Sequence, residues 1–264
     1  MDTQKKLISF GTLFNETWNV YLSRFKTLIS IAILPAFIFF LGISGIGLGG
    51  ILATTVGYLF IVAGVIFYLF SALALIYAIK EGVGFTASYR LAVNKIFAYL
   101  WINILSLLIV LGGFLMGIIP GFVFSIWFVF AGYIFVSEGQ KGMSALLKSK
   151  EYARGYWWPV FWRCFLLGLV LTGVSIAIVL PAAFIDKTVG DIVNSIIEVF
   201  LTPFVVLYTY LLYRKLAELK PEIATVAVTA KKGFFVFASI LGIISSVLLT
   251  IGAATALILL NPGE

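Results

Sequence analysis

The chain has no histidine and a single cysteine, Cys164, among its 264 residues. The absence of histidine excludes Ser-His-Asp and Cys-His nucleophilic sites, the most common general base and most zinc sites. One cysteine excludes an internal disulfide or a cysteine cluster. Cys164 lies in an apolar run, and we interpret it as a small packing residue. No glycine-rich loop precedes a lysine to cradle a phosphate. We therefore expect no enzymatic activity, no metal and no cofactor.

Charge is also scarce. Only 11% of the residues are charged, whereas 62% are hydrophobic, and the mean hydropathy is +1.14. A soluble domain carries charge on about a quarter of its residues. Too few charged residues are present to cover a water-facing surface, so lipid is the expected solvent.

Long apolar runs take the place of charge. About seven runs approach the roughly 20 residues that a membrane helix needs. They are continuous and show no alternation, which favours α-helices over a β-barrel. We therefore predict an all-α fold, a polytopic transmembrane helical bundle of about seven spans. The predicted spans are Thr27–Gly47, Ile51–Ile79, Ile96–Gly117, Ile118–Ser137, Trp158–Ala183, Ile192–Tyr213 and Phe234–Leu260.

The links between these runs alternate in character. Gly42–Gly50, Gly112–Gly121 and Ala182–Asp191 are short and nearly uncharged, whereas the other links are longer and basic. Every Lys and Arg except Lys187 falls on the basic side. Positive charge beside a span stays in the cytoplasm, so we predict a multi-pass protein of the prokaryotic cytoplasmic membrane with a cytoplasmic N-terminus. This topology accounts for the net charge of +7, and we expect no nucleic-acid partner.

The basic links have the pattern of amphipathic helices lying at the cytoplasmic interface. In Phe10–Phe25, the side chains of Phe14, Trp18 and Tyr21 share a face that Asn19 avoids. We expect this face to contact lipid or the bundle. Three later links repeat the pattern less regularly, with the apolar residues Phe85, Tyr89, Ala92, Val93 and Ile96, then Met143, Leu146, Leu147 and Trp157, then Ile223, Val226, Ala227 and Ala230 after Pro221.

These links suggest an internal repeat within a single integral membrane domain, residues 1–264. Each unit consists of an interfacial helix, a span, a short outer turn and a second span. The predicted units cover about residues 8–80, 82–138 and 140–216, followed by a terminal half unit at 220–260. The competing interpretation is that basic inner links are amphipathic by chance.

Three stretches resemble a loose group of prokaryotic polytopic membrane proteins. They are FGTLFNETWNVYLSRFKTLISIAILP, EGQKGMSALLKSKEYARGYWWPVFWRCFLLG and TPFVVLYTYLLYRKL. The group includes the membrane domain attached to some glycerophosphoryl diester phosphodiesterases and several uncharacterised families. In those phosphodiesterases the chemistry belongs to a separate soluble domain, which these 264 residues do not contain. The resemblance therefore implies a membrane fold and no phosphodiesterase activity.

A polar stripe marks the sixth predicted span, where Pro203 also interrupts the hydrogen-bond ladder. One interpretation is an outward-opening pocket or proton-coupled site, because an intramembrane carboxylate usually faces a cavity or a partner. The other places the acidic groups near the outer interface and the remaining groups in interhelical hydrogen bonds. The stripe consists of Asp191, Asn194, Ser195, Glu198, Thr202 and Thr209.

Aromatic and basic residues gather where spans begin on the predicted inner side. Indole rings favour the headgroup level, and an arginine there can reach a lipid phosphate. The cluster indicates either simple anchoring or a defined site for anionic lipid. The candidate headgroup contacts are Trp157, Trp158, Trp162, Arg163, Arg24 and Lys26.

Two function classes follow. The first is a non-enzymatic scaffold or accessory subunit that engages membrane lipids, anionic at the cytoplasmic face, and a protein partner or a second copy of the chain. The second is a transporter of a lipid or small solute that uses the sixth-span stripe.

Overall fold

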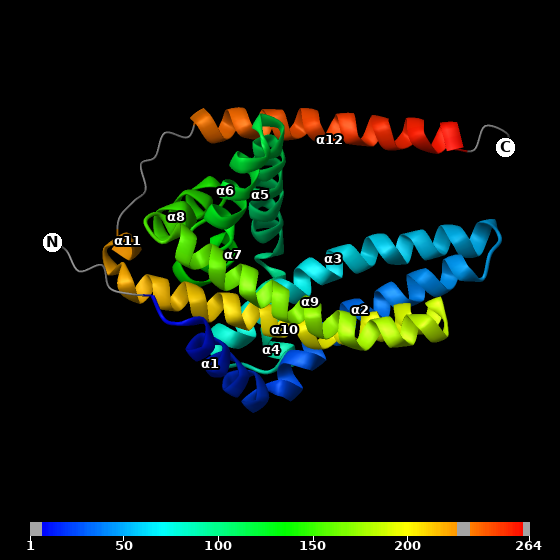
Figure 1. Cartoon of the computed structure of the whole chain (residues 1–264), viewed down its shortest axis with the longest axis horizontal. Helices are drawn as coiled ribbons and strands as arrows, with labels where there is room; N and C mark the ends of the chain where they lie inside the picture. Colours follow the sequence, from blue (N-terminus) through cyan, green and yellow to red (C-terminus); the bar gives the residue numbers. More distant parts are fainter. Residues whose placement is uncertain (1–6, 226–232, 261–264) are drawn as a thin grey trace. The chain divides into compact units, whose positions relative to one another are not determined.

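All regular secondary structure in the described part of the chain is α-helical (Figure 1). The computed structural model describes residues 7–225 and 233–260. The helices are α1 (Phe10–Ser23), α2 (Phe25–Gly47), α3 (Ile51–Glu81), α4 (Phe85–Val93), α5 (Ile96–Met116), α6 (Ile118–Phe128), α7 (Ala131–Glu138), α8 (Met143–Ala153), α9 (Trp157–Ile185), α10 (Lys187–Leu219), α11 (Pro221–Thr225) and α12 (Gly233–Leu260).

The predicted class, an all-α polytopic membrane bundle, is confirmed. Six helical stretches of the described residues are long and apolar enough to cross a membrane. They are Phe25–Gly47, Ile51–Glu81, Ile96–Met116, Ile118–Glu138, Trp157–Ile185 and Val189–Leu219. The seventh predicted span falls on α12, of which Gly233–Val247 forms a shorter apolar helical stretch. A seventh crossing and the sidedness of the chain stay predictions.

The chain divides into two compact units. Unit 1 comprises residues 1–97 and 158–219, and unit 2 comprises residues 98–157 and 220–264. These boundaries do not follow those of the repeats proposed from the sequence. The repeat and the single-domain organisation stay predictions.

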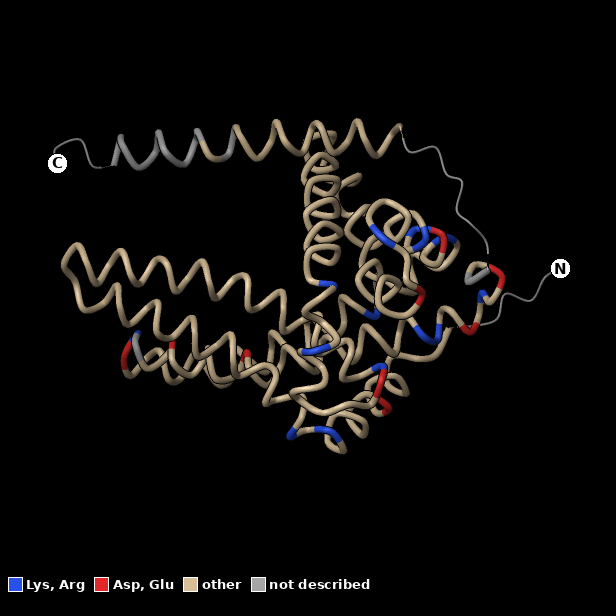
Figure 2. The backbone as a smooth tube through the Cα atoms, turned by 180° about the vertical axis from the view of Figure 1, so that it is seen from behind, with Lys and Arg blue, Asp and Glu red and all other residues tan. Residues whose placement is uncertain are grey.

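In unit 1, α2 and α3 form an antiparallel hairpin in which glycines allow close backbone approach (Figure 1). A Cβ added at Gly57 would lie 2.7 Å from the Gly42 carbonyl oxygen and 2.8 Å from the Ile46 nitrogen. The charged residues of the hairpin lie at its open end, around Lys26 and Lys80. The remainder of α2 and α3 carries no charged residue (Figure 2). This distribution suits a hairpin immersed in hydrocarbon.

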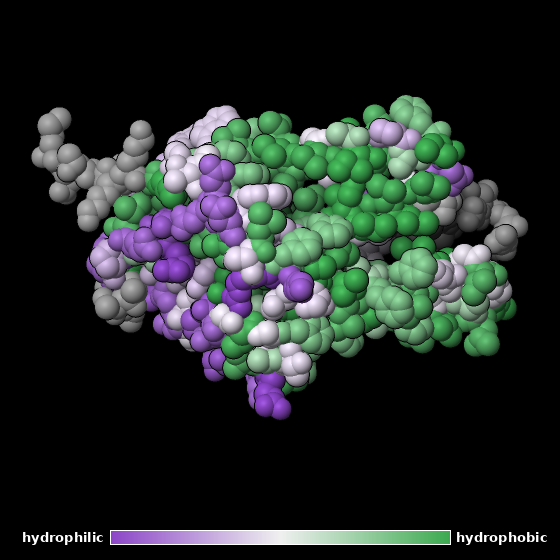
Figure 3. Space-filling view, turned by 90° about the horizontal axis from the view of Figure 1, so that it is seen from below, coloured by the Kyte–Doolittle hydropathy of each residue, from purple (hydrophilic) through white to green (hydrophobic). Residues whose placement is uncertain are grey.

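Exposed apolar side chains cover the membrane-length helices. The face seen in Figure 3 is mainly hydrophobic over these helices. Helix α9 is the extreme case, because Val160 and Leu167 are its only buried residues. Since lipid tails solvate such side chains, this exposure needs no protein partner.

Helix α1 forms where the amphipathic pattern predicts a helix. Ser9 caps it, its hydroxyl accepting a hydrogen bond from the Thr12 N–H at 3.2 Å. The predicted apolar face packs on α10, where the rings of Phe14 and Trp18 lie 5.2 Å and 6.1 Å from that of Phe204. The face therefore contacts the bundle, and its position in the membrane plane stays a prediction.

Tyr21 links α1 to α10 close to Pro203. Pro203 has no N–H to donate within α10 and disturbs the hydrogen bonds around it. The nearby Phe200 carbonyl accepts a hydrogen bond from the Tyr21 hydroxyl at 3.0 Å. This hydrogen bond joins α1 to α10 within one turn of the proline.

We expect the Tyr21→Phe variant to lose part of the alkaline sensitivity of the protein. Burial raises the pKa of Tyr21 from 10.0 to about 12. A group whose pKa is raised by folding contributes stability below its unfolded pKa and loses that contribution as the pH rises through its folded value. Between about pH 10 and 12, the free energy of unfolding measured in detergent should therefore decrease less steeply with pH for Tyr21→Phe than for the wild type. Equal slopes would contradict the buried hydroxyl.

In unit 2, the fourth predicted span is not one continuous helix. It breaks between α6 and α7, at Val129 and Phe130. The hydroxyl of Ser149, on α8, donates to the Trp127 carbonyl at 2.6 Å and accepts from the Phe130 N–H at 3.2 Å. These two hydrogen bonds satisfy backbone groups that the break exposes, as a membrane environment demands.

Helix α8 is more deeply embedded than its basic composition suggests. Lys148 is 3% exposed and lies 2.5 Å from the Glu138 carboxylate, which also accepts a hydrogen bond from the buried Tyr152 hydroxyl at 2.8 Å. At the end of α8, the Lys220 ammonium donates to the backbone carbonyls of Glu151, Tyr152 and Arg154. Lysine is favoured at this position because it offsets the negative end of the helix dipole.

The other link helices correspond to their predicted positions. Helix α4 covers the pattern that begins at Phe85, and the Tyr89 hydroxyl donates to the Ile31 carbonyl at 3.1 Å. Pro221 is the first residue of α11, as predicted. The remaining predicted apolar positions of that link, Val226, Ala227 and Ala230, lie outside the described residues.

Candidate functional site

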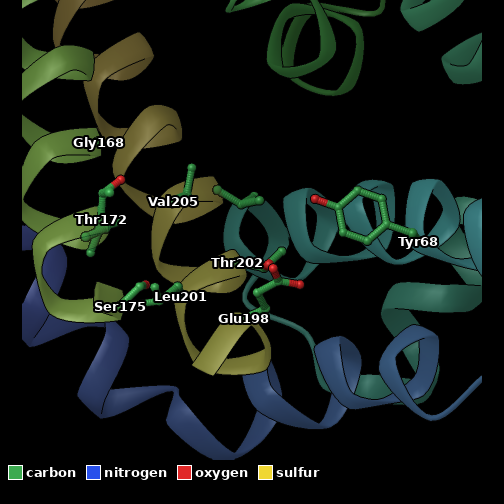
Figure 4. A pocket seen from close by; sticks show the side chains of 10 residues that line it. Tyr68, Gly168, Thr172, Ser175, Glu198, Leu201, Thr202 and Val205 are labelled. Carbon is green, nitrogen blue, oxygen red and sulfur yellow. The ribbon is translucent and has the colours of Figure 1, made fainter. Parts of the chain in front are cut away.

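A groove in unit 1 lies among α3, α9 and α10 (Figure 4). Its volume is about 400 Å³, and it is open on one side. This volume falls within the range of small-molecule sites, roughly 300–1,000 Å³. The groove is lined by Tyr68 of α3, by Gly168, Leu171, Thr172 and Ser175 of α9, and by Glu198, Leu201, Thr202, Val205 and Val206 of α10.

Helical spacing brings these residues to the groove. On α9, Gly168, Thr172 and Ser175 are separated by four and three residues, so they follow one another along a single face. On α10, Glu198 and Thr202 have the same relation. Gly168 adds room, because a Cβ built there meets no atom within 4 Å.

Among the described residues of the lining, Glu198 alone is charged. Its Oε1 accepts a hydrogen bond from the Asn194 amide, one turn earlier, at 3.1 Å. No other hydrogen bond or ion pair connects its carboxylate to the described residues. Glu198 lies about 9 Å from the midpoint of the 31-residue span, at about 1.5 Å per residue. In a centred span it would therefore lie inside the hydrocarbon layer, whose half-thickness is about 15 Å.

The hydroxyl groups of the groove differ from those elsewhere on these helices. Ser195 and Thr209 each donate to the carbonyl four residues earlier, at 2.9 Å and 2.8 Å. By contrast, the groove hydroxyls make no hydrogen bond to any described residue. These hydroxyls belong to Tyr68, Thr172, Ser175 and Thr202. In Figure 4 the Tyr68 hydroxyl is turned toward the side chains of α10.

A hydroxyl without a partner in hydrocarbon is costly. The free groups in the groove therefore favour a bound molecule or water that supplies hydrogen bonds. Together the groups offer several hydroxyl donors and acceptors, one carboxylate and an apolar wall. They provide no nucleophile paired with a base. Among the described residues, no group of three His, Cys, Asp or Glu side chains could hold a metal ion.

Only part of the polar stripe predicted on the sixth span lines the groove. Glu198 and Thr202 line the groove, and Asn194 supports Glu198 from outside the lining. Thr209 is buried and bonded within its own helix. The other two members, Asp191 and Ser195, are exposed and lie outside the lining.

The α3 and α9 sides of the groove were missed by sequence reasoning. The spacing of Gly168, Thr172 and Ser175 in an otherwise apolar run was a usable signal, because it places small and polar residues on one face. Tyr68 gives no comparable signal, since only the packing of α3 brings it to the groove.

The candidate headgroup arginines have protein partners. Arg163 donates to the backbone carbonyls of Leu7, Ile8 and Pro159. Arg24 donates to those of Ala78 and Val83, at 2.5 Å and 3.2 Å. Both side chains therefore secure chain segments within unit 1.

The remaining candidate headgroup contacts vary in exposure. Trp158 and Trp162 are 62% and 49% exposed, and Lys26 is exposed as well. The Trp157 indole donates to the Val123 carbonyl at 3.4 Å. Lipid contact by these four residues and the two arginines stays a prediction.

Comparisons with known proteins add no assignment. No family model matches the chain, and no significant match was found among curated proteins or solved structures.

Proposed function

We propose that this protein is a non-enzymatic, lipid-binding membrane protein that acts as a scaffold or accessory subunit. Its binding site is the groove among α3, α9 and α10. The observation that carries the proposal is the open groove itself, in which unbonded hydroxyls and one carboxylate face an apolar wall.

An amphiphile fits this lining better than a water-soluble solute. Leu171, Leu201, Val205 and Val206 offer an apolar wall for an acyl chain. The exposed aliphatic surface of α9 continues from the groove with Leu169 and Val170. A lipid could therefore enter from the bilayer, placing its polar part against Glu198 and the hydroxyls.

Transport of a lipid or small solute is the second candidate. The observation that favours it is a carboxylate facing a groove within a span that also contains Pro203. A transporter would move its ligand across the membrane of reconstituted vesicles, whereas a scaffold would bind the ligand without net movement across that membrane. A vesicle flux assay distinguishes the two.

The first test fills the groove. Gly168→Phe should reduce lipid retention about tenfold or more, because losing a few buried CH₂ contacts at about 0.8 kcal/mol each exceeds the 1.4 kcal/mol of one decade. Native mass spectrometry of the purified protein titrated with a phospholipid measures the retained adducts.

Gly173→Phe is the matched control. Gly173 belongs to the same helix and lies outside the groove lining. A Cβ built there also meets no atom within 4 Å. This variant should retain lipid like the wild type. If both variants bind as the wild type does, the groove is not the lipid site.

A further inference from the structure

We propose that the groove selects a lipid whose headgroup carries an ammonium group. This inference rests on the proposed lipid-binding function and specifies the ligand of the same site. The observation behind it is the charge of the lining, in which a carboxylate has no lysine or arginine beside it among the described residues.

The geometry leaves one side of the Glu198 carboxylate available. Asn194 occupies Oε1, while Oε2 has no hydrogen bond or ion pair with any described residue. A carboxylate oxygen is a pure acceptor, so its natural partner is an N–H donor, and a cationic donor gives the stronger hydrogen bond. An ammonium group would also neutralise a charge that is costly at this depth.

The surrounding groups match the other needs of an ammonium. The hydroxyl of Thr202, one turn from Glu198 on α10, can accept another of its N–H groups. The aromatic ring of Tyr68 adds a surface that attracts cations. A phosphate in the same position would face the Glu198 charge with no basic residue among the described residues of the lining to hold it. The phosphate of an aminolipid, which lies two carbons from the amine, is therefore expected at the open side of the groove.

The alternative source of an ammonium is a soluble amine. The apolar wall of Leu171, Leu201 and Val205 argues for a lipid, because a small free amine would leave this wall without contact. The proposal therefore commits to an ammonium that is covalently attached to acyl chains.

The test compares phosphatidylethanolamine with phosphatidylglycerol of identical acyl chains by native mass spectrometry of the full chain. The wild type should retain phosphatidylethanolamine about tenfold better, the effect expected from one charge-assisted hydrogen bond. Glu198→Gln keeps the shape of the side chain and should lower this retention to the level of phosphatidylglycerol. Asp191→Asn is the matched control, since it removes a carboxylate from the same helix outside the lining, and it should keep the preference.

Each outcome has a defined meaning. Equal retention of the two lipids by the wild type, or a preference that survives Glu198→Gln, overturns the ammonium assignment. If Gly168→Phe still abolishes retention in that case, the lipid groove itself stands. If Gly168→Phe changes nothing, the proposed function fails instead. Adducts with ethanolamine in the absence of any lipid adduct would assign the contact to a soluble amine and overturn the lipid commitment.

Discussion

Replacing Lys148 by methionine is expected to destabilise the protein by about 3–5 kcal/mol, the usual effect of breaking a buried ion pair. The Lys148 and Glu138 side chains are 3% and 14% exposed, and the Lys148 ammonium lies 2.5 Å from the Glu138 carboxylate. Methionine preserves much of the volume but removes the ammonium from the Glu138 carboxylate, which also accepts a hydrogen bond from the Tyr152 hydroxyl. Reversible unfolding of the purified protein in mixed micelles measures the change.

Two further variants separate the ion pair from general damage to α8. Adding Glu138→Gln to Lys148→Met removes the carboxylate charge that has lost its lysine, keeps an acceptor for Tyr152 and should restore most of the lost stability. Arg154→Ala breaks the ion pair with Glu151, in which Arg154 is 76% exposed, and should cost less than about 1 kcal/mol. Equal losses from Lys148→Met and Arg154→Ala would contradict the buried pair.

The second large effect is expected at the α2–α3 hairpin. Gly57→Val should destabilise unit 1 by about 3 kcal/mol, at the upper end of the usual cost of overpacking. The new Cβ would lie within 2.8 Å of the Gly42 oxygen and the Ile46 nitrogen. Because these are backbone atoms, the two helices must separate. Distance measurements between spin labels on α2 and α3 should report that separation.

Gly47→Val is the control for this variant. Gly47 is on α2 of the same hairpin, and a Cβ built there meets no atom within 4 Å. Its effect should stay within the roughly 0.5 kcal/mol typical of uncrowded surface positions. A comparable loss from both variants would show that the cost arises from β-branching in the helix and that close packing is not its cause.

The apolar runs and amphipathic links were sufficient to predict the fold class and the positions of most helices. Both patterns are local, since they depend on hydrophobicity over a few turns. The break at Phe130 was not predictable in this way, because it depends on the Ser149 hydroxyl reaching it from another helix. The burial of Lys148 has the same origin. Its partner, Glu138, lies on a different helix, so the local pattern of the basic link does not indicate the pairing.

Two of the ten residues that line the candidate site followed from the sequence. Glu198 and Thr202 were found because a carboxylate and a hydroxyl four residues apart stand out in an apolar helix. Asp191 and Thr209 share that stripe by helical angle, yet they differ from Glu198 in height along α10 and do not line the groove. Periodicity defines a face of a helix, whereas a site also requires neighbouring helices at the same height.

The central claim is that the groove holds an aminolipid headgroup against Glu198. An electron cryo-microscopy structure of the protein in nanodiscs of phosphatidylethanolamine tests it most directly. The account predicts headgroup density between Tyr68, Thr202 and Glu198, with the amine nitrogen within hydrogen-bonding distance, about 2.7–3.2 Å, of Glu198 Oε2. A groove closed by its own side chains, or one containing only an acyl chain, would contradict it.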